Sequence, residues 1–229
     1  MPFYIDEYYI ILVIPAILFS LLCQFMLSST YKKYSQIGSR RRMTGMMVAQ
    51  SILKSNGIYD VSVEHVGGKL TDHFDPQAKK IRLSDEVYNG TSIAALGIAA
   101  HETGHSIQHN NGYFPIKIRS AILPITNIGS IISMPIIILG LILSFPLLID
   151  IGLILFSFVF IFQLITLPVE FNASSRAMRA LNEYNILDKD ELNGTKKVLN
   201  AAAMTYVAGL AVTLAQLLRL LILTNRRRR

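Results

Sequence analysis

Residues 121–169 read AILPITNIGSIISMPIIILGLILSFPLLIDIGLILFSFVFIFQLITLPV, and Asp150 is the only charged residue among them. A helix of about 20 apolar residues spans the hydrocarbon core of a bilayer, so this run is too long for one crossing and suits two. The turn between the two arms is expected between Ser144 and Asp150, where a proline interrupts the run. The run therefore predicts two membrane helices, at about 121–144 and 148–168.

The composition of the whole chain agrees with a membrane protein. The 229 residues are 52% hydrophobic and 16% charged, whereas soluble domains carry about a quarter charged residues. One more apolar run covers residues 8–27, and a last apolar stretch covers 203–223. Polar residues from Thr205 to Arg219 share one face of that last helix, so it either crosses the bilayer or lies in its interface. We therefore expect three or four membrane helices.

Basic residues flank the apolar runs and account for the formal net charge of +7. Lys and Arg are enriched in the cytoplasmic loops next to membrane helices. The first run follows Asp6 and Glu7 and precedes Lys32, so we expect a retained anchor with its N-terminus outside, not a cleaved signal peptide. The polar part of the chain is then cytoplasmic, in a protein of the plasma membrane. A fourth crossing would place Arg226 to Arg229 outside, against this bias.

Two classes of site are not expected. Cys23 is the only cysteine and lies inside an apolar run, so the sequence offers no disulfide framework and no thiolate metal site. The basic residues lie beside membrane segments rather than in a patch of their own, so the lipid bilayer is an expected partner and nucleic acid is not.

The segment before residue 121 has a different pattern. Alternating apolar residues predict strands near 60–65 and 80–83, joined as a short β-hairpin across a turn-rich stretch at 72–76. An Ala-rich segment predicts a helix that begins near Thr91 or Ser92. This part of the chain predicts a small α+β unit of zincin-like type.

Residues 170–200 predict further helix, with a break at Asn193-Gly194. We expect one domain over residues 1–229. The predicted fold class is a mainly α membrane protein, with three or four membrane helices and the small α+β cytoplasmic part.

The motif that carries chemistry is His101-Glu102-Thr103-Gly104-His105. Two histidines four residues apart lie on the same face of a helix, and their imidazoles can bind one metal ion. The glutamate beside the first histidine can then act as general base for a zinc-activated water. The alternative is a histidine pair satisfied by hydrogen bonds inside a membrane-protein core. The spacing predicts that His101 and His105 bind Zn2+ and that Glu102 is catalytic.

A catalytic zinc site needs a third protein ligand. His109 lies further along the same helix, where three ligands in a line cannot surround a metal, so it is expected to be a polar residue at the helix end. His65 and His73 fall in the hairpin region, either as surface residues or as groups near the ligands or the substrate. Glu170 follows the second membrane arm, which returns the chain to the side where the first arm entered. On topology alone Glu170 is either the third ligand or an interfacial carboxylate.

The His-Glu-x-x-His motif, followed by PVEFNASSRA at residues 168–177, resembles the YugP-like family of neutral membrane zinc metallopeptidases. The segments LTDHFDP at 70–76 and LSDEVY at 83–88 also resemble that family. The resemblance covers nearly the whole chain from about residue 30. It implies a zinc cofactor and a gluzincin-type site in which Glu170 is the third metal ligand.

More distantly, the layout is similar to the HtpX and CAAX-processing membrane proteases. Their downstream motif is close to Glu-x-x-Ala-Asp, and this sequence has Ser174 where they have the Asp. A serine can still accept a hydrogen bond from an imidazole N–H, but it does so without charge. Arg176 and Arg179 either anchor their helix at lipid headgroups or steady an oxyanion.

The sequence predicts a membrane-bound zinc endopeptidase that hydrolyses peptide bonds of membrane-associated proteins or peptides. The distant resemblance implies that an extended substrate lies along an edge strand, which we expect in the hairpin between Val61 and Leu83. A proline at Ile81 is then expected to raise KM and to leave the zinc content intact. Two alternatives stay open: a zinc hydrolase of a lipid amide or ester, and a non-catalytic membrane adaptor.

Overall fold

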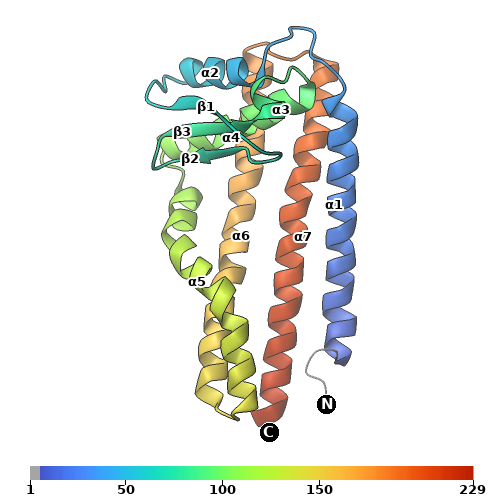
Figure 1. Ribbon diagram of the computed structural model, residues 1–229, viewed down its shortest axis with the longest axis vertical. Coiled ribbons are helices and arrows are strands. Elements are labelled where there is room, and N and C mark those ends of the chain that lie inside the picture. Colours follow the sequence, from blue (N-terminus) through green and yellow to red (C-terminus); the bar gives the residue numbers. More distant parts are fainter. Residues whose placement is uncertain (1–5, 229) are drawn as a thin grey trace. The chain divides into compact units, whose positions relative to one another are not determined.

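The computed structural model describes residues 6–228, with side chains up to residue 225, and it is mainly helical (Figure 1). The expected fold class, a mainly α membrane protein with a small α+β part, is confirmed. The chain divides into two compact units. The first holds the described residues within 1–24, 117–167 and 204–229, and the second holds 25–116 and 168–203. The elements in chain order are η1 (Tyr9–Val13), α1 (Ile14–Ser35), α2 (Gly45–Ser55), β1 (Ser62–Val66), β2 (His73–Asp75), β3 (Lys80–Ser84), α3 (Asp85–Tyr88), α4 (Ile93–Asn110), α5 (Phe114–Ile142), α6 (Pro146–Glu183) and α7 (Lys189–Arg228).

Four helical segments of the described chain are long and apolar enough to cross a membrane. The spans expected at 8–27, 121–144 and 148–168 overlap the first three of these segments over most of their length, and 203–223 falls within the fourth. The helices outrun the apolar stretches because they continue into the polar part of the chain. The four segments are Tyr9–Ser35, Phe114–Ile142, Pro146–Glu183 and Lys189–Asn225.

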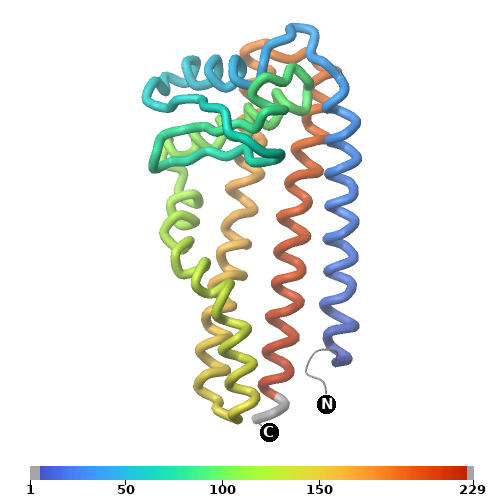
Figure 2. Tube along the Cα trace, viewed as in Figure 1, coloured from blue at the N-terminus to red at the C-terminus, as the bar shows by residue number. Residues whose placement is uncertain are grey.

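In the first unit, α5 and α6 form the expected helical hairpin (Figure 2). The turn between them lies at residues 143–145, where Ser144 has a φ of 52°. Glycines let the two helices approach closely. A Cβ on Gly129 would lie 2.8 Å from the carbonyl oxygen of Leu155, and one on Gly152 would lie 2.9 Å from that of Ser133. Close approach through small residues is the usual way in which helices pack in a membrane, because lipid supplies little hydrophobic driving force between them.

The polar face of α7 makes specific contacts within the first unit. Gln163 of α6 donates through Nε2 to the hydroxyl of Thr213, at 2.9 Å. Arg219 is buried and pairs with Asp6, with Nη2 2.7 Å from Oδ2. The polar residues that left the placement of this helix open are therefore used, at least in part, between helices. The side chains of Arg226 to Arg229 lie outside the described residues.

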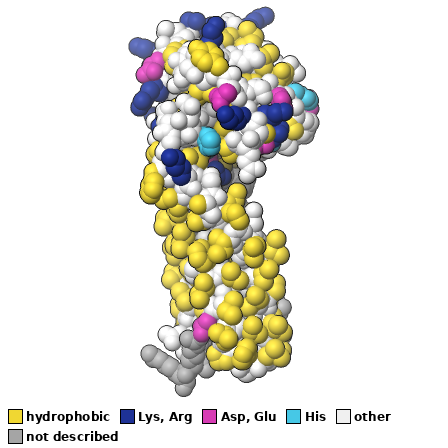
Figure 3. Space-filling model, turned by 90° about the vertical axis from the view of Figure 1, so that its left-hand side faces the viewer, with side chains coloured by type: hydrophobic (Ala, Val, Ile, Leu, Met, Phe, Trp, Pro, Cys, Tyr) yellow, Lys and Arg dark blue, Asp and Glu magenta, His cyan; other side chains and the backbone are white. Residues whose placement is uncertain are grey.

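The surface of the first unit is apolar. On the face shown in Figure 3, hydrophobic side chains cover the helices of this unit, whereas Lys, Arg, Asp and Glu side chains gather over the second unit. Ile131 and Ile142 of α5 are both 74% exposed. Apolar exposure on this scale suits contact with lipid and is unusual for contact with water.

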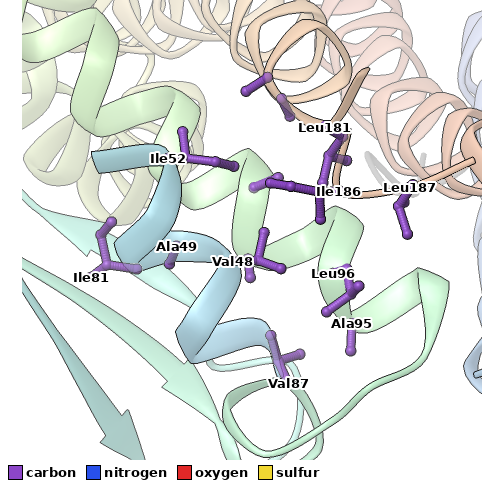
Figure 4. Packing of buried hydrophobic residues seen from close by; sticks show 14 of the residues in the cluster. Val48, Ala49, Ile52, Ile81, Val87, Ala95, Leu96, Leu181, Ile186 and Leu187 are labelled. Carbon is purple, nitrogen blue, oxygen red and sulfur yellow. The ribbon is translucent and has the colours of Figure 1, made fainter. Parts of the chain in front are cut away.

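The core of the second unit forms where α2 packs on α4 (Figure 4). Val48 and Ile52 lie four residues apart in α2, so both point from one face of that helix toward α4. Ile81 of β3 and Leu181 of α6 join the same buried cluster. This core fixes α4, which carries the His-Glu-x-x-His motif, against the sheet and against α6.

The sheet corrects the predicted strand pairing. β1 and β3 pair in parallel, with Val63 opposite Ile81, so they do not form the expected hairpin. β2 pairs antiparallel with β3, with Phe74 opposite Ile81, and the strand order is β1-β3-β2. The short hairpin of the fold is therefore β2–β3. Local alternation located the strands β1 and β3, but a pattern along the chain does not define which strands pair or in which direction.

The predicted helix break at Asn193-Gly194 is also wrong. These residues lie inside α7, and the break comes earlier, where Asn185 adopts a φ of 51° between α6 and α7. A Cβ on Gly194 would lie 2.6 Å from Cδ1 of Ile93 and 2.8 Å from the ring of Tyr34. The glycine thus serves close packing within the helix rather than ending it.

Candidate functional site

Helix α4 begins where the sequence predicts. The Ser92 side chain caps it by accepting a hydrogen bond from the backbone N–H of Ala95, at 3.2 Å. The helix is buried along most of its length, and the small residues that precede the motif allow this. A Cβ on Gly97 would lie 2.6 Å from Cγ2 of Thr195, so α7 also packs closely on α4 within the second unit.

Gly104, between the two histidines of the motif, sets the distance between α4 and α6. A Cβ at this position would lie 2.6 Å from the backbone carbonyl oxygen of Ala173. Because no other residue lacks a Cβ, only glycine permits this approach without a shift of the backbone. Ala173 lies between Glu170 and Ser174, so the same contact brings both of these side chains next to the motif.

The structure brings together the three side chains predicted as metal ligands. Nε2 of His101 lies 3.2 Å from Oε2 of Glu170, and Nε2 of His105 lies 3.7 Å from the same oxygen. The ligand atoms all lie within 4.8 Å of one another. Glu170 is only 3% exposed and His105 is 9% exposed. Three converging donors on two helices, with His105 and Glu170 buried and His101 half-buried, thus form a compact group that a metal ion could join.

The donor set and its spacing fit zinc. Two imidazoles and one carboxylate are the protein ligands of many catalytic zinc sites. Two ligands of a tetrahedral zinc lie about 3.4 Å apart, since each is about 2.1 Å from the metal. The two imidazole nitrogens lie 3.2 and 3.7 Å from the Glu170 oxygen, on either side of that value.

Each histidine is held at its outer ring nitrogen by another side chain. Nδ1 of His101 lies 3.1 Å from the hydroxyl oxygen of Ser174, the hydrogen-bond partner expected for this serine. Nδ1 of His105 lies 3.1 Å from Oε1 of Gln108. Such partners orient metal-binding imidazoles and keep the inner nitrogen turned toward the ion.

The electrostatics of the group favour a positive charge. Burial lowers the pKa of His105, but the Glu170 carboxylate, 3.7 Å from Nε2, and the nearby charge of Glu102 outweigh burial and hold the pKa above its ordinary value. A site that stabilises an extra proton on an imidazole also stabilises a cation placed among the same groups.

Glu102 lies beside His101 on α4 and is half-buried. Within residues 6–228 its carboxylate makes no hydrogen bond to another residue of the chain. The carboxylate is therefore available to a water molecule or a substrate at the edge of the group.

The other three histidines lie elsewhere on the second unit. His65 is paired with Asp85, and Nδ1 of His73 donates to the backbone carbonyl of Thr71 at 2.7 Å. His109, in the last turn of α4, packs its ring against Phe74 with 5.9 Å between the ring centroids. None of the three belongs to the group formed by His101, His105 and Glu170.

Two residues near the group were not singled out in the sequence. Gln108 is fully buried and donates to the backbone carbonyl of Val169 at 2.7 Å. Asn172 accepts hydrogen bonds from Gln108 and from Nε of Arg176, at 3.0 and 2.7 Å. Arg176 is thus tied to α6 itself. The sequence offers one signal for Gln108, which lies one helical turn after His105. Its role becomes visible only through its hydrogen bonds to Val169 and Asn172 of α6.

The chain has recognisable relatives among known proteins. The family model described as "Putative neutral zinc metallopeptidase" matches residues 9–225. The chain is similar to the "Putative membrane protease YugP" of Bacillus subtilis (strain 168), with 45% identity over 211 residues, 92% of this chain and 94% of that protein. No solved structure matches the chain at a significant level. With a family model that matches almost from end to end, the chain belongs to the family described as "Putative neutral zinc metallopeptidase".

Proposed function

We propose that this protein is a membrane-bound, zinc-dependent endopeptidase with a gluzincin-type site. The observation that carries the proposal is the convergence of His101, His105 and Glu170 from two separate helices, with all ligand atoms within 4.8 Å. Membership of a family described as zinc metallopeptidases supports it, as does the similarity to a protein described as a membrane protease.

In this proposal His101 and His105 bind zinc through Nε2, and Glu170 binds it through its carboxylate. Zinc, when bound, would supply a Lewis acid that polarises the scissile carbonyl and lowers the pKa of a water molecule. Glu102 accepts the proton of the attacking water and later passes it to the leaving amine. Its carboxylate is half-buried, lies next to one ligand and makes no hydrogen bond within residues 6–228, which suits that role.

We propose β2 as the edge strand along which an extended substrate lies. β3 is the central strand of the sheet, and β2 is the outer strand that packs on α4. The Phe74 ring on β2 meets His109 near the end of α4. Hydrogen bonds between the substrate backbone and such an edge strand depend little on the side chains of the substrate. We therefore expect the enzyme to cleave a broad range of peptides and membrane proteins at the cytoplasmic face.

One alternative uses the same site on another bond, such as a lipid amide or ester. The other is an adaptor in which the two histidines and Glu170 merely satisfy one another by hydrogen bonds. Zinc content separates the adaptor from both hydrolases, and a substrate panel separates the two hydrolases.

The test compares Glu102→Gln with Glu183→Gln, a change at an exposed glutamate at the end of α6. Glu102→Gln is expected to lower cleavage of a quenched fluorescent peptide mixture by about 10²–10⁴-fold while zinc content stays at the wild-type level. Glu183→Gln is expected to keep both. His105→Ala and Glu170→Ala are expected to lose zinc. Wild-type cleavage by Glu102→Gln would remove Glu102 from its role, and purified wild-type protein without zinc would favour the adaptor.

A further inference from the structure

A row of hydrogen-bonded side chains leads from His105 to Arg176, and it lies wholly within the second unit. His105 meets Gln108, Gln108 meets Asn172, and Asn172 meets Arg176. The row matters because each contact restricts which group can be the donor and which the acceptor. Taken in order from Arg176 through Asn172 and Gln108 to His105, these restrictions determine which ring nitrogen of His105 carries a proton.

The orientation of Asn172 is set by Arg176. A guanidinium has only donors and stays charged at any ordinary pH, so the atom of Asn172 that faces Nε of Arg176, at 2.7 Å, is the amide oxygen. The guanidinium carbon of Arg176 also lies 6.0 Å from the centre of the Tyr113 ring, which helps to hold the arginine in place.

The orientation of Gln108 follows from two acceptors. The backbone carbonyl of Val169 only accepts, and so does the oxygen of Asn172, so the side of Gln108 that faces both is its NH₂ group. Gln108 is 0% exposed, so no water competes for these contacts. Its carbonyl oxygen must therefore face Nδ1 of His105.

His105 is then left with one arrangement. An amide oxygen only accepts, so Nδ1 of His105 must carry the hydrogen, and the lone pair of the neutral ring lies on Nε2. Nε2 is the atom that faces Glu170. His101 has no such restriction, because the Ser174 hydroxyl can either donate or accept.

We propose that Gln108 is a positioning residue that holds His105 in the Nδ1–H tautomer, with Asn172 and Arg176 fixing the orientation of the Gln108 amide. The role of this tautomer in binding metal rests on the proposed function, whereas the tautomer itself does not. Partners at the outer nitrogen of metal-binding histidines typically affect metal affinity by about 10- to 100-fold.

The test compares two substitutions at Gln108. Gln108→Leu removes both the acceptor for His105 and the donor to Val169, whereas Gln108→Glu keeps an acceptor for His105. Two readouts are taken: the zinc dissociation constant by competition with a chelator, and the ¹⁵N spectrum of the histidines in zinc-free protein at a pH where the rings are neutral. We expect Gln108→Leu to bind zinc about 10- to 100-fold more weakly and to show His105 partly as the Nε2–H tautomer. Gln108→Glu is expected to stay within about threefold of wild type and to keep the Nδ1–H tautomer.

The comparison separates orientation of His105 from a structural tether between α4 and α6. A mere tether between α4 and α6 predicts that His105 stays in the Nδ1–H tautomer in Gln108→Leu even if zinc binding weakens, and that outcome would overturn the proposal. An unchanged tautomer and zinc affinity in Gln108→Leu would overturn it as well. Should Gln108→Leu fail to fold in detergent, Asn172→Leu serves in its place: it is expected to weaken zinc binding several-fold, and wild-type values would count against the proposal. Wild-type protein that binds no zinc would remove the proposed function, while the spectrum would still decide the tautomer.

Discussion

Ser174 and Gln108 hold the two histidines of the site by different chemistry. Ser174 offers His101 a neutral hydroxyl that can rotate, whereas Gln108 offers His105 a fixed amide oxygen. The HtpX and CAAX-processing membrane proteases, to which the layout of the sequence is distantly similar, have a carboxylate where this chain has Ser174. The hold on His101 should therefore be the weaker of the two.

Two changes at Ser174 should have different effects on zinc affinity. Ser174→Ala removes the partner of His101 and is expected to weaken zinc binding about tenfold, because the ring loses its fixed orientation. Ser174→Asp supplies a charged acceptor at the same place and should bind zinc at least as tightly as wild type. Competition with a fluorescent chelator measures both constants. Wild-type affinity in Ser174→Ala would mean that His101 is oriented by its packing alone.

For individual site residues, the sequence predicts those whose arrangement depends on a single helix and few others. His101 and His105 could be predicted as a pair because the geometry of an α-helix is fixed. Glu170 needed the resemblance, since topology alone left an interfacial carboxylate equally open. Gln108 and Asn172 could not be found, because their contacts exist only once α4 and α6 lie at the distance that Gly104 allows.

The contact between α4 and α6 depends on one missing Cβ, and Gly104→Ala tests it. The added methyl would lie 2.6 Å from the Ala173 carbonyl, so the helices must separate. The gain of about 1 kcal/mol in helix propensity is set against about 1–3 kcal/mol of overpacking, so we expect a net loss of about 0–2 kcal/mol in stability. Zinc affinity should fall much more, because Glu170 and Ser174 move away from the motif.

Gly67→Ala is the matched control, because a Cβ there would meet nothing within 4 Å. It is expected to change neither zinc affinity nor the melting temperature in detergent. If Gly104→Ala also kept wild-type zinc affinity, the close approach of α4 and α6 would not be what assembles the site.

The position of β3 in the sheet reverses the result first expected for a proline at Ile81. An edge strand would tolerate the change and show only a raised KM. β3 is instead central, paired on both sides, and Ile81 is 0% exposed. Ile81→Pro is therefore expected to cost about 3 kcal/mol or more and to release zinc with the fold. Melting in detergent with zinc analysis measures this, with Ile81→Val as the mild control at about 1 kcal/mol. A raised KM with wild-type melting would contradict the strand order.

The sequence thus predicts the type and position of most helices and strands, but it does not predict which strands pair. Long apolar runs located the membrane helices, and alternation located β1 and β3, because both signals are local. The sequence predicts a turn where strand β2 lies, since the strand has only three residues and falls in a stretch rich in Asp and Pro. The parallel pairing of β1 with β3 depends on residues far apart in the chain, and no local pattern carries it.

For the whole molecule, the open question from the sequence was whether α7 crosses the bilayer. Asp6 precedes α1, Arg219 lies near the end of α7, and the two form an ion pair within the first unit. The start of α1 and the end of α7 therefore lie together. If α1 crosses the bilayer, the end of α7 lies on the same side as the start of α1, and we predict that α7 is a fourth crossing.

Cysteine labelling tests this topology. Single cysteines in a Cys23→Ala background at exposed positions Gln36, Ser144 and Asn225 mark the end of α1, the α5–α6 turn and the end of α7. With four crossings and a cytoplasmic site, Ser144→Cys and Asn225→Cys should react with an impermeant maleimide in intact cells, and Gln36→Cys only after permeabilisation. An interfacial α7 would make Asn225→Cys behave like Gln36→Cys. If only Gln36→Cys were labelled in intact cells, the protein would have the opposite orientation, with the proposed site outside. The basic residues after α1 would then not determine its orientation.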